Sequence, residues 1–237
     1  MEYLLATLTS LGVFLLGLLA RFALLLLVLA VLAIPVFLVL VGIRGYGVLR
    51  QRALGLTRVD GLFWRPGLYY APGHTWVKLE GARALRVGLD DLAQRLLSGV
   101  RAVELPRSGA EVQEGAVAAV ITCGNKRAAI ASPVDGTVTA ANEVVGRDPS
   151  VIQRDPYARG WLFAVAPANS RYTRFCRGEP ARSWLREEGA RLAQFLERNL
   201  GLAAADGGEF LFPAPSLLSD EQWEALTRAF LKTGQES

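Results

Sequence analysis

The sequence has few of the residues from which catalytic and metal sites are built. Its 237 residues include one histidine, His74, and two cysteines, Cys123 and Cys176, with no CxxC motif and no Cys/His cluster. We therefore expect no metal site, because such a site needs several of these ligands close together. Two isolated cysteines favour a reducing compartment. No serine, cysteine or carboxylate is placed beside His74 by the sequence, so we expect a structural histidine and no enzyme.

A strong charge imbalance is also missing. The formal net charge is +4, and the basic residues gather after the apolar N-terminus rather than along a separate face. Nucleic-acid binding is therefore not expected.

The N-terminal segment lacks charge almost completely, since Arg21 is the only charged residue from Tyr3 to Ile43. Residues 22–43 form a run of about 33 Å as a helix, which is enough to cross a bilayer. A signal peptide is not favoured, because there is no basic n-region and Arg44 follows directly. We predict a transmembrane helix over 22–43, with Pro35 as a possible kink. Residues 1–21 would lie in the far interface or pack on a partner, and a second span is the alternative.

Basic residues follow the predicted span. Arg44, Arg50, Arg52 and Arg58 stand in a connector predicted over 44–66. By the positive-inside rule they place the rest of the chain on the cytoplasmic side of the inner (cytoplasmic) membrane. They would also contact anionic lipid headgroups.

From residue 67 to 169 the sequence consists of short runs in which apolar and polar residues alternate with period two. Glycine and proline separate these runs. We predict strands at 75–80, 84–89, 102–105, 111–112, 116–121, 127–130, 136–141 and 161–165. A short helix is predicted at 90–97. Many short strands with such turns favour a β-sandwich or barrel.

The C-terminal segment, residues 170–237, is predicted to be helical. An apolar stripe runs through residues 179–199, with Gly201 as its C-cap. Ser219 and Gln222 form a capping box before a second helix that reaches Leu231. These helices either enlarge the core of the β-domain or dock a partner subunit.

Several motifs follow one another in a characteristic order over about residues 67–169. They are Tyr70-Ala-Pro-Gly-His-Thr-Trp-Val77, Val87-Gly-Leu-Asp-Asp-Leu-Ala-Gln94, Val103-Glu-Leu-Pro106, Ser132-Pro-Val-Asp-Gly136, Ala141-Asn-Glu143 and Asp155-Pro-Tyr-Ala-Arg-Gly-Trp-Leu162. In this order they resemble the H protein of the glycine cleavage system, a lipoyl carrier. The resemblance implies a mainly β, barrel-sandwich hybrid domain with short flanking helices. We expect a transmembrane helix before that domain and two helices after it.

The resemblance also implies a lipoyl-lysine at the tip of a hairpin. Counting from Val103-Glu-Leu-Pro106 forward and from Ser132-Pro133 backward places that position on Asn125, and Lys126 comes one residue late. A one-residue shift on a strand turns the side chain to the opposite face. Gly124-Asn125 suits a tight turn, and we predict Lys126 and Arg127 to be a solvated pair beside it. Lipoylation of Lys126 remains the alternative.

Cys123 stands beside that tip. We expect it to act as a small apolar residue. A redox role would need a lowered thiol pKa, which Lys126 and Arg127 could promote.

Two functions therefore stay open. The first is a non-catalytic, membrane-anchored subunit without a cofactor, whose H-protein-like domain is an interaction or scaffold module among other subunits of a membrane complex. An electron-transfer or energy-transducing complex is the kind of assembly we consider. The second is an active membrane-tethered carrier with lipoyl on Lys126.

Overall fold

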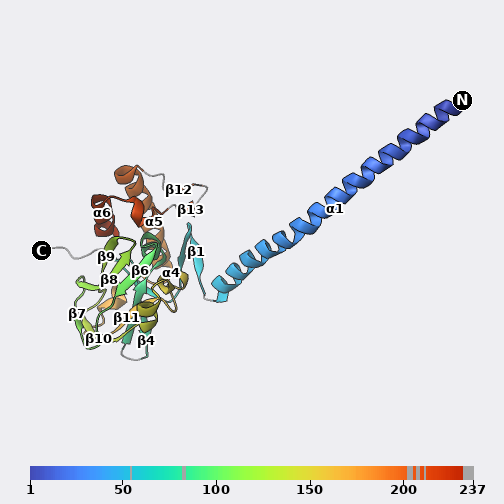
Figure 1. The fold of residues 1–237 in the computed structure, drawn as a ribbon. Coiled ribbons are helices and arrows are strands. Elements are labelled where there is room, and N and C mark those ends of the chain that lie inside the picture. The colour runs from blue at the N-terminus through green and yellow to red at the C-terminus, as the bar shows by residue number, and fades with distance from the viewer. Residues whose placement is uncertain (54, 82–83, 202–204, 207–208, 211, 232–237) are drawn as a thin grey trace. The chain divides into compact units, whose positions relative to one another are not determined.

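The computed structural model describes residues 1–53, 55–81, 84–201, 205–206, 209–210 and 212–231. The chain divides into two compact units, Met1–Ala53 and Leu54–Ser237 (Figure 1). We describe each unit separately.

The first unit is one uninterrupted helix, α1 (Glu2–Ala53), which contains Pro35. Its segment Ser10–Ile43 is long and apolar enough to cross a membrane by length and composition. This candidate span includes Arg21 and is longer than the segment 22–43 predicted from the sequence. The helix also continues into the region predicted as a connector, and it ends at Ala53.

The second unit is built mainly from short antiparallel strands. A six-stranded sheet has the order β3-β4-β5-β11-β10-β7, and a three-stranded sheet has the order β6-β8-β9. Their strands are β3 (Tyr69–Ala71), β4 (Thr75–Glu80), β5 (Ala84–Leu89), β6 (Val100–Glu104), β7 (Glu111–Val112), β8 (Val117–Cys123), β9 (Lys126–Ala131), β10 (Gly136–Ala141) and β11 (Trp161–Pro167). The predicted mainly β fold with flanking helices is confirmed.

The two sheets enclose one main apolar cluster, to which alternate residues of the strands contribute. Val87, Ile121, Ile130 and Phe163 are among its fully buried members. The alternation arises because successive strand side chains point to opposite faces. This shared core fixes the position of the β8–β9 hairpin relative to the rest of the domain.

Several helices flank the sheets. They are α2 (Asp91–Leu96), α3 (Glu143–Arg147), α4 (Val151–Arg154), the 3-10 turns η1 (Arg171–Arg174) and η2 (Pro215–Leu217), α5 (Glu179–Leu200) and α6 (Asp220–Leu231). The capping box predicted for α6 is confirmed: the Gln222 backbone N–H donates to Ser219 Oγ (3.1 Å), and the Ser219 N–H donates to Gln222 Oε1 (3.0 Å). Gly201 adopts the left-handed conformation predicted for the C-cap of α5.

A hairpin absent from the sequence-based prediction precedes the sheets. Strands β1 (Thr57–Val59) and β2 (Leu62–Trp64) pair across a two-residue Asp60-Gly61 turn. Both turn residues have positive φ, as a type I′ turn requires. Two further strands of two residues each, β12 (Ala205–Asp206) and β13 (Glu209–Phe210), form an antiparallel pair.

Gly88 is a position where the fold needs a residue without a side chain. It lies opposite Trp76 in the β4–β5 pair, and a Cβ at Gly88 would lie 2.4 Å from the Trp76 ring. The ring is buried and donates its Nε1–H to the Pro156 carbonyl (3.2 Å). The replacement Gly88→Ala is therefore expected to lower the free energy of unfolding by about 1–3 kcal/mol, through overpacking.

Urea unfolding followed by tryptophan fluorescence checks this expectation, because all five tryptophans lie in the second unit. Gly146→Ala in α3 is the matched control, since a Cβ there meets open space. An unchanged urea midpoint for Gly88→Ala would contradict the described packing.

Candidate functional site: the β8–β9 tip and its helical cover

The β8–β9 hairpin ends in a two-residue turn. Cys123 pairs with Lys126, so Gly124 and Asn125 form the loop. Gly124 has φ +62°, while Asn125 is not among the non-glycine residues with positive φ. This pattern matches a type II′ turn, in which glycine takes the first central position. Asn125 is exposed at the apex.

The side chains of Lys126 and Arg127 lie on opposite sides of β9. The Lys126 side chain is only 7% exposed, and Nζ forms an ion pair with the Asp220 carboxylate of α6. Arg127 is exposed and pairs with Glu104 across the sheet (2.7 Å). The predicted solvated pair is therefore wrong for Lys126, because α6 covers it. The carboxylate of Asp220 is 95% exposed, so this ion pair contributes little stability.

Helix α6 covers the edge strand of the three-stranded sheet. The Trp223 indole donates to the main-chain carbonyl of Arg127 on β9 (2.7 Å). Leu226, Phe230 and Leu231 enter the main core cluster. At the other end of α6, the Leu231 carbonyl oxygen lies 3.4 Å from the position that a Cβ on Gly73 would take. The helix thus runs from the hairpin tip to the β3–β4 turn, and Figure 1 shows it beside β9.

His74 connects this turn to both tail helices. It is fully buried with φ +55°; Nδ1 lies 2.8 Å from Asp90 Oδ2, and Nε2 lies 3.2 Å from Glu188 Oε2 of α5. The ring stacks on Trp184 at 5.1 Å and lies 6.2 Å from Phe230. Burial by itself lowers the pKa of His74, but the two carboxylates outweigh it and raise the pKa to about 9. His74 is therefore a buried cation between two acids.

Glu188 completes this cluster. Burial favours its neutral form, yet hydrogen bonds from His74 and Arg191 outweigh burial and lower its pKa to about 2. Arg191 also donates to the Ala229 carbonyl (3.1 Å) and lies over the Phe230 ring at 4.1 Å. The proximity of Asp90 and Glu188 to His74 was not predicted from the sequence. Since the imidazole is fully buried and pairs with Glu188 of α5, the arrangement joins the β3–β4 turn to the tail.

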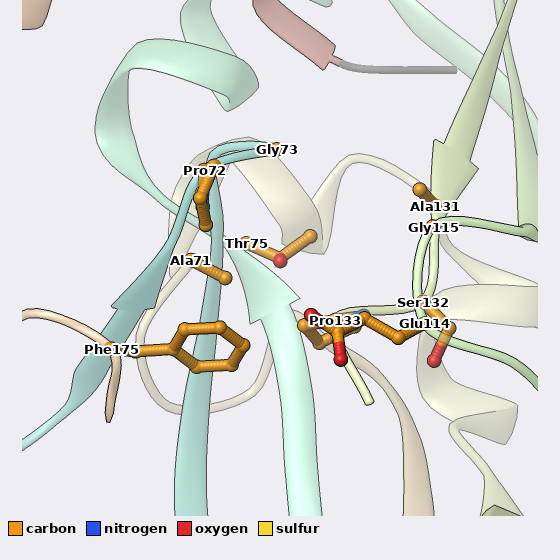
Figure 2. Close-up of a pocket in the computed structure, with 10 residues that line it drawn as sticks. All are labelled: Ala71, Pro72, Gly73, Thr75, Glu114, Gly115, Ala131, Ser132, Pro133 and Phe175. Atoms are coloured by element: carbon orange, nitrogen blue, oxygen red, sulfur yellow. The ribbon is translucent and has the colours of Figure 1, made fainter. Parts of the chain in front are cut away.

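A small pocket of about 180 Å³ lies near the base of the hairpin (Figure 2). Its lining is mostly apolar or small, and includes Pro72, Pro133 and Phe175. The Ser132 hydroxyl already donates to the Val134 carbonyl (2.7 Å), and Glu114 pairs with Arg174 (2.5 Å). The side chains of Ser132 and Glu114 at this pocket therefore have partners within the domain.

Cys123 does not have the environment of a reactive thiol. It is fully buried, its Sγ donates to the Leu97 carbonyl (3.3 Å), and burial raises its pKa to about 12. A redox role would need a lowered thiol pKa, and the pKa of Cys123 is raised instead. The prediction that Cys123 acts as a small apolar residue is confirmed. Among the residues with described positions, no group of three His, Cys, Asp or Glu could hold a metal ion.

The geometry defines a class of protein: a mainly β domain of two principal sheets with an exposed hairpin apex and added helices. The family model described as "Glycine cleavage H-protein" matches residues 68–188. The chain belongs to this family. The match begins close to residue 67, where the domain predicted from the motifs begins. It ends inside α5, beyond residue 169, where that predicted domain ends.

Curated relatives agree with this assignment. The glycine cleavage system H protein of Thermoanaerobacter sp. (strain X514) is 39% identical over 99 residues, which are 42% of this chain and 77% of that protein. The glycine cleavage system H protein 1 of Caldanaerobacter subterraneus is 42% identical over 98 residues, 41% of this chain and 77% of that protein. Among solved structures, an H protein from Mycobacterium marinum is 27% identical, with a TM-score of 0.42, over 44% of this chain and 87% of that one.

Proposed function

We propose that this chain is a non-enzymatic, membrane-anchored subunit whose H-protein-family domain serves as an interaction or scaffold module and carries no lipoyl group. The observation that supports this most directly is the arrangement at the tip. The exposed apex residue is Asn125, which cannot form an amide with lipoate, and the neighbouring Lys126 is buried beneath α6. The domain would keep the shape of a carrier without its attachment point.

The membrane part of the proposal depends on α1. Its segment Ser10–Ile43 is a candidate span, and arginines follow it at positions 44, 50 and 52. By the positive-inside rule, the β-domain would lie on the cytoplasmic side of the inner membrane, with these arginines and Arg58 near anionic headgroups. A membrane complex, of the electron-transfer or energy-transducing kind, would supply the other subunits.

The second candidate is an active carrier with lipoyl on Lys126. It is favoured by the position of Lys126, one residue from the apex. For modification, however, the amine would have to separate from Asp220 and leave its position beneath α6. The Lys126 amine is nearly buried, so it could reach a ligase only if α6 opened locally.

Intact-mass measurement of the natively expressed chain tests the two candidates, followed by incubation with a lipoate–protein ligase and lipoate. We expect no lipoyl mass on the wild type before or after incubation. The variant Asn125→Lys places a lysine at the exposed apex, and we expect it to gain one lipoyl group at residue 125. Peptide mapping locates the addition.

Lys126→Ala is the matched control, and it should behave as the wild type. A lipoyl group on wild-type Lys126 that disappears in Lys126→Ala would overturn the proposal and establish the carrier alternative.

A further inference from the structure

The apolar part of α1 is too long for a bilayer. Ser10–Ile43 comprises 34 residues, or about 51 Å of helix, against about 30 Å of hydrocarbon. Fitting that length by tilt alone would need about 54°, beyond the usual range of 0–40°. None of this segment is buried inside the chain. Some of its apolar surface therefore lies outside the lipid unless another protein covers it.

Arg21 makes the conflict sharper. If residues 22–43 fill the hydrocarbon, Arg21 stands at its far boundary, and the apolar residues 3–20 project beyond it by about 27 Å. If the helix moves so that residues 3–20 enter the lipid, Arg21 enters with them, at a cost of about 2.5–3.5 kcal/mol or more. Each placement leaves one group without a suitable environment. A protein partner resolves both.

One stripe of α1 combines Arg21 with small and hydroxyl side chains and one aromatic residue. Thr7, Ser10, Phe14, Gly17 and Arg21 follow at steps of three and four residues, so they lie on one face. The Thr7 hydroxyl donates to the Tyr3 carbonyl (3.0 Å), as such side chains do in membrane helices. A Cβ at Gly17 would meet nothing within 4 Å, so a neighbouring backbone can approach closely there.

The charge on this face decides between occupants. In a parallel pair of this chain, the face would bring Arg21 against Arg21, and like charges at close range in a low dielectric repel strongly. A carboxylate at the same depth would instead neutralise Arg21 and accept a bidentate hydrogen bond.

We infer that the Arg21 face of α1 docks against a transmembrane segment of a different subunit, which carries an Asp or Glu side chain at the depth of Arg21. The inference rests on the proposed membrane anchoring. It extends that proposal by naming the face, the residue and the chemistry of the partner.

Site-specific photo-crosslinking of the full-length chain in its native membranes tests the inference. A photoreactive residue replaces Phe14, on the Arg21 face, or Leu19, on the opposite face as the matched control. We expect an adduct with another protein from position 14 at about tenfold the yield from position 19. The difference reflects proximity, because only the face that docks lies against the partner's helix. Sequencing should place the crosslink in a membrane segment that contains Asp or Glu.

Two substitutions at Arg21 complete the design. Arg21→Leu makes the helix more apolar, so insertion is retained, and we expect the position-14 adduct to fall about tenfold. Arg21→Lys keeps the charge and should keep most of the adduct.

Other results overturn the inference. These are equal yields at positions 14 and 19, an adduct between two copies of this chain, a crosslinked segment without a carboxylate, or insensitivity to Arg21→Leu. Absence of any adduct from a chain that resists carbonate extraction also overturns it, while leaving the anchor intact. Release of the chain by carbonate overturns the membrane anchor itself.

Discussion

Replacing His74 with asparagine is expected to lower the free energy of unfolding of the β-domain by about 3–5 kcal/mol. The substitution removes the buried cation between Asp90 and Glu188 and leaves two acids facing each other inside the domain. Asparagine tolerates the positive φ of this position, so the loss reports the cluster rather than backbone strain. Urea unfolding of the full chain in detergent, followed by tryptophan fluorescence, measures it.

Arg147→Ala is the matched control. It removes an exposed pair with Glu143, whose side chains are 81% and 78% exposed, so the expected change is below about 1 kcal/mol. A loss for His74→Asn as small as that of the control would contradict the described cluster.

The same cluster gives the wild type a defined dependence on pH. His74 has a folded-state pKa of about 9, above its ordinary 6.5. Its contribution is therefore complete below about pH 6.5 and decreases as the pH rises to 9, by about 1.4 kcal/mol per unit. Glu188 has a lowered pKa of about 2, so its contribution is present above about pH 4.5 and decreases as the pH falls. Stability from this cluster should be greatest between about pH 4.5 and 6.5.

Urea midpoints measured from pH 5 to 9 should fall in the wild type above about pH 6.5 and stay flatter in His74→Asn. Because the sequence has one histidine, an NMR titration of its ring assigns the pKa without ambiguity. A His74 pKa near 6.5 would show that the carboxylates do not control it.

The fold was largely predictable because its determinants are local. Period-two alternation located β4, β5 and β10 with correct bounds, and Ser219 with Gln222 located the start of α6. The β1–β2 hairpin was missed although its Asp60-Gly61 turn is a strong signal, because the preceding arginines suggested a connector. Its strands have only three residues each, too few for alternation to be recognised.

The site was only partly predictable, because its decisive contacts join residues that are far apart in the chain. The two-residue turn and the exposed Asn125 followed from the register of the motifs. The cover over Lys126 did not, since Asp220 lies 94 residues further on. An apolar stripe on α6 shows that the helix packs, but it does not identify the surface on which it packs. The acids around His74 were hidden for the same reason, as Glu188 follows it by 114 residues.

The cover itself leads to the second large effect. Replacing Trp223 with alanine is expected to lower the free energy of unfolding by about 3–5 kcal/mol, through a cavity in the core and loss of the indole hydrogen bond to Arg127. Trp223 is 5% exposed and packs α6 against β9. Fluorescence from the other four tryptophans follows the unfolding. Leu217→Ala, at an 80% exposed residue just before α6, is the matched control and should be nearly neutral.

Trp223→Ala should also expose Lys126. If α6 shields the Lys126 amine, the substitution should increase the labelling of Lys126 by an amine-reactive compound. The compound is used at a concentration that leaves the domain folded. Labelling of Lys126 is expressed relative to that of Lys78, which is exposed in the wild type. Peptide mapping separates the two lysines. Equal labelling of Lys126 in the wild type and in Trp223→Ala would mean that the amine is already accessible. That result would remove the main argument against a lipoyl group at this position.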